Sequence, residues 1–260
     1  MSEIENALEK LDIPKNSSVI VHGNSAIAIS IKLPSKEEKL QKMAELIMNF
    51  FEDKNTLIVP AFTYSFPCNE IYDPITSPSK VGQFSEYFRN NTDMIRTRHP
   101  IFSCLIKGSK SDLFMNASIA DCFGTNTIFD FLLRDKGYIV LLGCNLNQVT
   151  FAHYVEQYAQ VYYRYFKEFV GYIADDFENE VVTQYYVRDL NLGLDTRLDL
   201  TDLWLKARSL GLVKFCYLDR FLCLSIRSDY FSELAMEMIH KNPHALIGEN
   251  FKNSRKIQLF

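Results

Sequence analysis

Residues 18–61 read SVIVHGNSAIAISIKLPSKEEKLQKMAELIMNFFEDKNTLIVPA, and they set the architecture of the chain. The segments Ser18–His22 and Thr56–Ala61 are short apolar runs rich in β-branched residues, which predicts two buried strands. Between them, Ser35 is followed three residues later by Glu38, the capping-box pattern that begins a helix. Apolar residues then recur at helical spacing up to the turn before the second strand. A helix between two strands that are apolar throughout indicates a parallel βαβ unit.

The remaining sequence continues these patterns and then changes character. Further buried strands are expected over Phe102–Lys107 and Tyr138–Gly143. Further helices are expected over Gln83–Asn91, Thr127–Arg134, Thr150–Gln160, Leu200–Leu210 and Ser228–Lys241. Alternating or aromatic runs typical of antiparallel strands lie at Tyr162–Phe169, Glu180–Asp189 and Phe215–Arg227. We therefore expect an α/β fold, a three-layer α/β/α sandwich with a mostly parallel central sheet and an additional antiparallel region in the second half.

The composition excludes several classes of protein. The 260 residues include 28 Lys and Arg against 32 Asp and Glu, which gives a formal net charge of −4, and 47% of them are hydrophobic. Disordered chains combine low hydrophobicity with high charge, so we expect a single folded domain over residues 1–260. Residues 161–227 are expected to form its antiparallel, insertion-like region. Clustered Lys and Arg, which bind phosphate backbones, are missing, so nucleic acid is not an expected partner.

The sequence also lacks the patterns of membrane and metal-binding proteins. The longest apolar runs, such as Tyr138–Gly143 and Leu46–Phe51, fall far short of the roughly 20 residues that span a bilayer, so no membrane is expected as a partner. The segment Met1–Lys15 lacks the basic and then apolar pattern of a signal peptide, which favours a cytoplasmic protein. The six cysteines are scattered without a Cys-x-x-Cys pair. We therefore expect buried thiols rather than disulfides or a zinc site, and no metal.

Aromatic residues are frequent, with 20 Phe and 14 Tyr. A large packed core and an aromatic-lined binding site would each explain this number. Several of these residues fall in an irregular segment, residues 62–80, that interrupts the pattern of helices and strands. Loops that long inside a compact domain are usually functional. Composition leaves both explanations open.

His153 is the histidine best placed for chemistry. It follows the strand expected over Tyr138–Gly143, and ligands of open parallel α/β sheets bind where strands end and helices begin. Glu156 comes three residues later, so the two side chains share one helix face. A carboxylate beside a histidine can hold the ring that accepts a proton. The same spacing also fits an ordinary surface or packing pair.

A second candidate feature is the glycine-containing turn before the helix expected over Thr127–Arg134. Its backbone N–H groups could receive an anion, because helix N-termini favour negative charge. The alternative is a plain glycine turn in which Thr127 caps the helix. The sequence contains no Walker loop, no Gly-x-Gly-x-x-Gly and no Gly-x-Ser-x-Gly, so the signatures of phosphoryl transfer, dinucleotide binding and serine hydrolysis are missing.

Several short motifs, in order and over roughly residues 10 to 165, together resemble the aminoglycoside 3-N-acetyltransferase family. These motifs are Val19-Ile-Val-His22, Ile58-Val-Pro-Ala-Phe-Thr-Tyr64, Tyr72-Asp-Pro, Ser77-Pro-Ser-Lys-Val-Gly82, Phe84-Ser-Glu-Tyr-Phe-Arg89, Arg96-Thr-Arg-His-Pro100, Ser103, Gly108, Phe123-Gly124, Val140-Leu-Leu-Gly143 and Thr150-Phe-Ala-His-Tyr-Val-Glu156. The resemblance implies a three-layer α/β fold with acetyl-CoA as co-substrate, lying along the strand ends. It also implies direct acetyl transfer to an amine, and it leaves a homodimer open by analogy.

The resemblance assigns roles to residues by their position in these motifs. His153 would be the general base and Glu156 its acidic neighbour, while Asn147 stands where many members carry an acidic residue. The residues expected at the coenzyme are His22, Gly23, Asn24, Ser25, Thr63, Ser103, Gly124, Thr125 and Thr127. The residues expected at the acceptor are Tyr64, Phe66, Tyr72, Asp73 and Asp189.

The expected acceptor follows from how this chain departs from the family. The segment 62–79 carries four aromatic residues but only Glu70 and Asp73 as acids, and a polycation favours a site rich in carboxylates. We therefore expect the acceptor to be a nucleotide-linked amino sugar, such as a perosamine-type 4-amino sugar used in surface polysaccharide synthesis. The alternatives are aminoglycoside acetylation, which confers antibiotic resistance, and a catalytically inactive CoA-binding protein, for which Asn147 is the only support.

Overall fold

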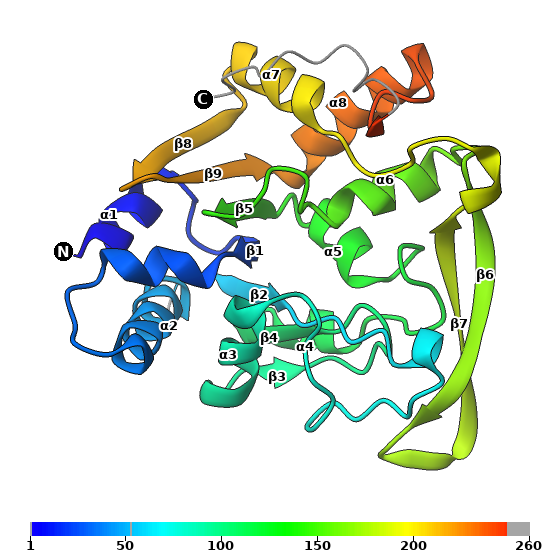
Figure 1. The fold of residues 1–260 in the computed structure, drawn as a ribbon, viewed down its shortest axis with the longest axis horizontal. Coiled ribbons are helices and arrows are strands. Elements are labelled where there is room, and N and C mark those ends of the chain that lie inside the picture. The colour runs from blue at the N-terminus through cyan, green and yellow to red at the C-terminus, as the bar shows by residue number, and fades with distance from the viewer. Residues whose placement is uncertain (1, 53, 249–260) are drawn as a thin grey trace.

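The computed structural model describes residues 2–52 and 54–248, and its centre is a seven-stranded sheet (Figure 1). The strand order is β3-β4-β2-β1-β5-β9-β8. In the middle, β1 pairs in parallel with β2 on one side and with β5 on the other. The outer pairs are antiparallel. The strands are β1 (Ser18–Gly23), β2 (Thr56–Pro60), β3 (Ile95–Arg96), β4 (Cys104–Gly108), β5 (Tyr138–Leu142), β8 (Val213–Leu218) and β9 (Phe221–Arg227).

The βαβ unit expected near the start of the chain is confirmed. The helix α2 (Lys36–Glu52) connects β1 to β2, and those two strands are parallel. The capping box forms as predicted, because Ser35 Oγ accepts from the Glu38 N–H at 3.1 Å and Glu38 Oε2 accepts from the Ser35 N–H at 3.0 Å. Two of the free N–H groups at this helix start are satisfied in this way.

Two hydrophobic cores, one on each face of the sheet, give the three-layer α/β/α arrangement that was predicted. Side chains alternate between faces along a strand. On β1, Val19 and Val21 pack into the core under α1, α2 and α3, whereas Ile20 packs into the core under α5, α6, α7 and α8. The helices are α1 (Glu3–Lys10), α3 (Gln83–Asn91), α4 (Ser111–Met115), α5 (Ile128–Arg134), α6 (Phe151–Tyr158), α7 (Thr201–Ser209) and α8 (Ser228–Lys241).

The sheet is mixed rather than parallel throughout. Only the three central strands β2, β1 and β5 run in parallel. On one side, the long segment after β2 brings β4 back beside it in the opposite direction. On the other side, β8 and β9 form a hairpin closed by Asp219 and Arg220. The parallel part of the sheet is therefore its centre, where strands are buried on both faces.

The first part of the antiparallel region expected in the second half is a separate two-stranded ribbon on one flank of the molecule (Figure 1). The expected run Phe215–Arg227 is antiparallel as well, but it belongs to the central sheet as part of β8 and β9. The strands of the ribbon are β6 (Arg164–Ile173) and β7 (Asp176–Arg188). Isolated bridges from Ile173 to Tyr72 and from Gln184 to Asp121 attach the ribbon to the loop after β2 and to the turn before α5. The ribbon therefore joins segments that lie far apart in the sequence.

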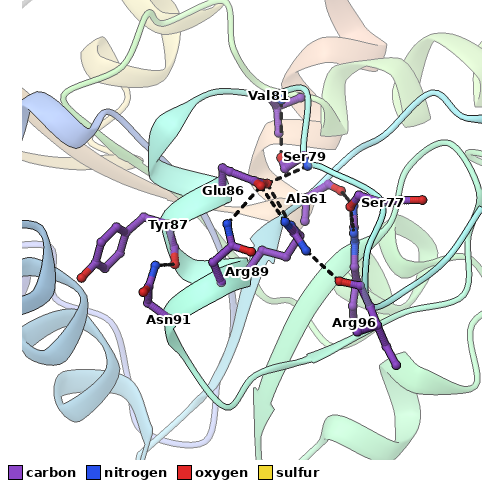
Figure 2. A network of polar contacts seen from close by, with 11 residues as sticks. Ala61, Ser77, Ser79, Val81, Glu86, Tyr87, Arg89, Asn91 and Arg96 are labelled. Carbon is purple, nitrogen blue, oxygen red and sulfur yellow. Dashed lines mark hydrogen bonds and ion pairs between the residues drawn. The ribbon is translucent and has the colours of Figure 1, made fainter.

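Buried polar contacts hold the long loop after β2 in place (Figure 2). The Arg96 guanidinium donates to the carbonyl oxygens of Ser77 and Ala61. From α3, Glu86 Oε2 accepts from the Ser79 N–H at 2.7 Å, and Arg89 donates to Glu86. The loop carries only a short 3₁₀ turn, η2 (Phe66–Cys68), so these contacts replace the hydrogen bonds of regular structure.

Most of the aromatic content builds the core. The largest fully buried side chains are all aromatic: Trp204, Tyr72, Tyr163, Phe51, Phe66, Phe84, Phe88, Phe114, Phe123, Phe129, Phe151 and Phe231. Four of the six thiols are also buried, those of Cys104, Cys122, Cys216 and Cys223. The short elements β3 and α4 were not expected from the sequence.

Within residues 2–52 and 54–248, no helix has the length and apolar character needed to cross a bilayer. Within these same ranges, no group of three or more His, Cys, Asp or Glu is placed to hold a metal ion.

Candidate active site

His153 and Glu156 form a hydrogen-bonded pair on α6, the helix that follows β5. Nδ1 of His153 lies 2.7 Å from Oε2 of Glu156. The Glu156 side chain is completely buried, whereas 21% of the His153 side chain is exposed. A carboxylate with no exposure beside a partly exposed imidazole is not an ordinary surface pair. The two residues that sequence spacing put on one face are therefore in direct contact.

Two residues that sequence reasoning missed complete this cluster. The Tyr163 hydroxyl donates to Oε1 of Glu156 at 3.0 Å. Nη2 of Arg164 lies 2.9 Å from Oε2 of Glu156, and only 1% of the Arg164 side chain is exposed. Both residues lie where the chain leaves α6 and enters β6. The sequence offered one indication of their role, which is that they lie in the aromatic run directly after the His153 helix. The same run is also typical of an ordinary strand, so it did not identify them.

The geometry fixes the protonation of the pair. Burial alone would raise the pKa of Glu156, but the Arg164 guanidinium and the bond to His153 outweigh it and hold that pKa below its usual value. An ionised carboxylate 2.7 Å from Nδ1 requires a proton on Nδ1, because two lone pairs would repel each other. Burial and the nearby Arg164 charge lower the pKa of His153, so the ring is neutral at neutral pH. The Nε2 lone pair is then available to a substrate.

The His153 ring packs beside a group of aromatic side chains. Its ring centroid lies 5.7 Å from that of Phe123, which in turn contacts Phe102 and Tyr185. No residue in the described ranges 2–52 and 54–248 hydrogen-bonds Nε2 of His153. The side chain is thus held at Nδ1 and open at Nε2, which is the arrangement a general base requires.

A cavity of about 150 Å³ lies at the carboxyl ends of the central strands. It is bounded by the ends of β1, β2 and β5 and by Thr150, the residue before α6. Parallel sheets place ligands at this edge. The lining residues are His22, Gly23, Pro60, Phe62, Tyr64, Val81, Ser85, Cys144, Gln148 and Thr150. Three of these, His22, Gly23 and Tyr64, were expected site residues.

His22 lines this cavity and carries a buried polar atom without a partner among the described residues. Its Nε2 is buried and has no hydrogen-bond partner within the described part of the chain. Burial lowers the pKa of His22 to about 4, so the imidazole is neutral at neutral pH. A buried polar atom without a partner is costly, and such atoms are typical of sites that a ligand fills. His22 is therefore suited to hydrogen-bond a ligand in the cavity.

Two residues of the cavity wall are restricted by the local structure, Tyr64 by its backbone angle and Gly23 by a neighbouring ring. Tyr64 has a left-handed backbone with φ of 59°, which is uncommon for a residue other than glycine. Strained positions of this kind cluster at functional sites. A Cβ atom at Gly23 would lie 2.6 Å from Cδ2 of Phe84, so only glycine fits against that ring.

The turn before α5 matches the glycine-turn alternative rather than an anion site. The Thr127 side chain accepts from the Asp130 N–H and caps the helix. Asp121 Oδ1 accepts from the N–H groups of Phe123 and Gly124, at 2.8 and 3.0 Å. Because side chains of the turn itself already satisfy these donors, Gly124 and Thr127 are committed to the turn. Thr125, between them, is exposed.

Several expected site residues are buried in the core of the structure and bond to its backbone. Tyr72 and Phe66 are 0% and 2% exposed, and the Tyr72 hydroxyl donates to the Thr97 carbonyl at 2.6 Å. Thr63 and Ser103 are equally buried and bond to the backbone at Pro100 and Ala61. Their position in the motifs did not reveal their burial, because a motif contains both residues that line a cavity and residues that pack beneath them.

Polar residues expected at the site also serve local structure. Asp73 accepts from the Ile75 N–H and the Thr76 hydroxyl, so it closes a turn. Asn24 caps the 3₁₀ turn η1 (Ser25–Ser30). The remaining assignments are that Ser25 donates to Gln83 at 3.1 Å, Asn147 accepts from the Leu200 N–H at 2.9 Å, and Asp189 caps the turn η3 (Leu190–Leu192).

Asp189 is hydrogen-bonded to a member of the His153 cluster, whereas Asn147 is hydrogen-bonded to another segment. The Asp189 N–H donates to the carbonyl of Tyr163 at 2.9 Å, and the hydroxyl of the same tyrosine donates to Glu156. Asn147 instead stabilises the segment that enters α7. The Asn147 side chain therefore has a structural partner of its own, and the His153–Glu156 pair forms without it.

Comparison with known proteins identifies a family. A model of the aminoglycoside 3-N-acetyltransferase family matches residues 32–208 of this chain. No curated protein sequence matches the chain in a direct comparison.

Solved structures share the fold at low sequence identity. One is a histidine-to-alanine mutant of aminoglycoside acetyltransferase AAC(3)-IVa in complex with a gentamicin, with a TM-score of 0.73, 20% identity, and coverage of 94% of this chain and 89% of that one. The AAC-IIIb binary structure with CoASH has a TM-score of 0.74 and 14% identity, covering 93% and 97%. YokD from Bacillus subtilis has a TM-score of 0.71 and 14% identity, covering 97% and 94%.

Proposed function

The chain belongs to the aminoglycoside 3-N-acetyltransferase family, whose members are acetyl-CoA-dependent N-acetyltransferases, and from this premise we propose that it acetylates a primary amine of an aminoglycoside. The observation that carries the proposal is the His153–Glu156 pair, with Nδ1 of His153 held at 2.7 Å and the ring partly exposed. A neutral imidazole oriented by a buried carboxylate is the base that amine acylation needs.

His153 would act on the proton of the attacking amine. An alkyl amine with a pKa of about 10 is neutral in only about one molecule per thousand at pH 7. As the amine nitrogen forms its bond to the thioester carbonyl carbon, Nε2 of His153 takes the N–H proton, and the negative charge moves to the carbonyl oxygen. Collapse of this intermediate breaks the C–S bond and releases the coenzyme as thiolate, which takes the proton from His153 and returns the ring to its neutral form. General-base assistance of this kind contributes typically 10²–10⁴-fold.

The cavity at the strand ends is the proposed place of the thioester. It lies beside Thr150, one turn before His153 on the same helix, so the carbonyl carbon and the base would be close together. His22 would supply a hydrogen bond there through its unpartnered Nε2. Direct transfer needs no protein nucleophile, and burial raises the pKa of the cavity thiol, Cys144, to about 12. Cys144 would therefore stay protonated and would not compete for the acetyl group.

An aminoglycoside acceptor is supported by the family and by the gentamicin complex of a protein with the same fold. In this chain, the acidic residue Asp189 is attached to the cluster through its backbone, because its N–H binds the Tyr163 carbonyl. A carboxylate there would attract a cationic acceptor toward His153. Acetylation of such a drug would confer resistance to it.

A nucleotide-linked amino sugar is the second candidate acceptor, and one observation favours it. The positive charge of Arg188 acts on His153, and the aromatic side chains Phe62 and Tyr64 line the cavity. A cation repels a polycationic drug and attracts a phosphate, whereas aromatic faces stack on a sugar or a base.

One assay tests the proposal. The protein is incubated with acetyl-CoA and, separately, with gentamicin, apramycin and a nucleotide-linked 4-amino sugar, and both thiol release and the mass of the product are followed. We expect thiol release and an acetylated product with the aminoglycosides. Turnover with the nucleotide-linked sugar alone would replace the acceptor and keep the acetyl transfer. No thiol release with any amine would reject the transferase proposal.

A further inference from the structure

Arg164 is a buried cation that touches both members of the His153–Glu156 pair. Its Nη2 lies 2.9 Å from Oε2 of Glu156 and 3.1 Å from Nδ1 of His153. Its Nη1 donates to the carbonyl oxygen of Tyr186 at 3.3 Å, which anchors the guanidinium to β7. With 1% of its side chain exposed, Arg164 cannot be screened by solvent. A histidine–carboxylate pair does not by itself need such a cation.

The charged groups that face His153 come from three elements. Glu156 lies on α6 with the histidine, Arg164 lies at the start of β6, and Arg188 lies at the end of β7. While His153 is neutral, the single carboxylate of Glu156 balances the single buried cation of Arg164. A proton on His153 would place two cations on one buried carboxylate, with Arg188 adding further repulsion. The cluster therefore favours the neutral ring.

We propose that Arg164 is a positioning residue that keeps His153 in its proton-accepting form at neutral pH, by sharing the carboxylate of Glu156 with it. The proposal rests on the function proposed above for His153. Without the guanidinium, Glu156 would act on the imidazole alone and stabilise the imidazolium. A substantial fraction of the enzyme would then carry a protonated base that cannot accept the proton of the amine.

The direction of each interaction agrees with this role. Burial first and the charge of Arg164 second lower the pKa of His153, while the bond to Glu156 raises it. Arginine suits the position because its planar fork binds two acceptors, Glu156 and the Tyr186 carbonyl, while its charge lies beside the imidazole and persists when buried. The contacts to Glu156, His153 and Tyr186 use this geometry.

The test is the pH dependence of kcat/KM for Arg164→Gln and Glu156→Gln, together with the titration of His153 followed by NMR in the free protein. Removing the buried cation should shift the midpoint of the acidic limb of kcat/KM to higher pH by about one pH unit or more. Removing the carboxylate should move the same limb to lower pH. Arg227→Gln is the matched control, because Arg227 pairs with Asp229 on another part of the sheet, and its limb should not move.

A purely structural role would give a different result. If the rate of Arg164→Gln falls by the same factor at every pH and its acidic limb stays in place, Arg164 only supports packing and the proposal is wrong. The proposal predicts instead that the Arg164→Gln rate approaches that of the wild type at alkaline pH, where His153 loses its proton in both proteins.

Two further measurements keep the proposal testable if Arg164→Gln does not fold. Arg164→Lys keeps the charge and should hold the acidic limb near its wild-type position. In the wild-type protein, NMR should give His153 a pKa below the usual histidine value, and a value above it would overturn the proposal without any variant. The NMR titration tests this proposal without any measurement of activity. The proposed role of His153 as the base is tested separately, because turnover by a His153 variant would reject that role.

Discussion

Nδ1 of His153 and Oε2 of Glu156 lie 2.7 Å apart, and the hydroxyl of Tyr163 donates to the other oxygen of the same carboxylate at 3.0 Å. The carboxylate therefore has both oxygens engaged and cannot rotate freely. Its orientation holds the imidazole through Nδ1 and leaves Nε2 as the ring nitrogen that can accept a proton.

Tyr163→Phe removes the hydroxyl that holds Glu156 and should lower kcat severalfold while KM for acetyl-CoA stays near its wild-type value. The loss also leaves a buried carboxylate oxygen without its donor, so the free energy of unfolding should fall by about 1–3 kcal/mol. Steady-state kinetics and urea unfolding measure the two effects. The control is Tyr72→Phe, which removes an equally buried hydroxyl bonded to the Thr97 carbonyl. Tyr72→Phe should lower the free energy of unfolding but keep the wild-type kcat. A fall in its kcat would support the expectation that Tyr72 contacts the acceptor.

Gly23→Ala should destabilise the protein by about 1–3 kcal/mol, because its Cβ would overlap the Phe84 ring in the cavity wall. The second change Phe84→Leu removes the ring and should recover part of this loss, so the double variant should be more stable than the sum of the single changes predicts. Urea unfolding of all four proteins measures the coupling. Strictly additive effects would show that the ring does not restrict position 23.

Stability should fall as the pH falls, partly because of His99. Its Nδ1 accepts from the N–H groups of Ile101 and Phe102, and burial lowers its pKa from 6.5 to about 4. The unfolded chain therefore binds a proton at His99 before the folded protein does. The stability from this residue is complete above pH 6.5 and is lost as the pH falls toward 4.

The size of this effect can be measured in His99→Asn. Between about pH 7 and about pH 5, the wild type should lose about 2 kcal/mol of unfolding free energy through His99. Urea unfolding should show that the variant is less stable than the wild type at the higher pH and that the difference narrows at the lower pH. His240→Asn changes an exposed histidine and should keep the wild-type slope. A difference between His99→Asn and wild type that is the same at both pH values would contradict the assignment.

Local signals in the sequence were enough to predict most elements and the His153–Glu156 contact. The helix over Gln83–Asn91 was predicted with its observed bounds, and Ser35 and Glu38 form the expected cap. His153 and Glu156 were predictable because helix geometry fixes which residues share a face. Each of these features depends on residues within one or two turns of each other.

The features that the sequence did not reveal depend on contacts between distant segments. The direction of β4 beside β2 is set by how the long loop returns, which its apolar pattern does not encode. Arg164 reaches Glu156 only because the chain folds back after α6. Tyr72 was expected at the acceptor, and the structure buries it completely against Arg96 and the Thr97 carbonyl. Motif membership identified the region of the site but not which side chains face it.

The most direct test of the account is the turnover of His153→Asn with acetyl-CoA and an acceptor amine, measured beside the binding of acetyl-CoA to the same variant. Asparagine keeps a polar side chain but cannot accept the proton at neutral pH. We expect kcat to fall by about 10²–10⁴-fold while the Kd for acetyl-CoA stays within about twofold of the wild type. Turnover near the wild-type rate would show that His153 is not the base and would contradict the central claim.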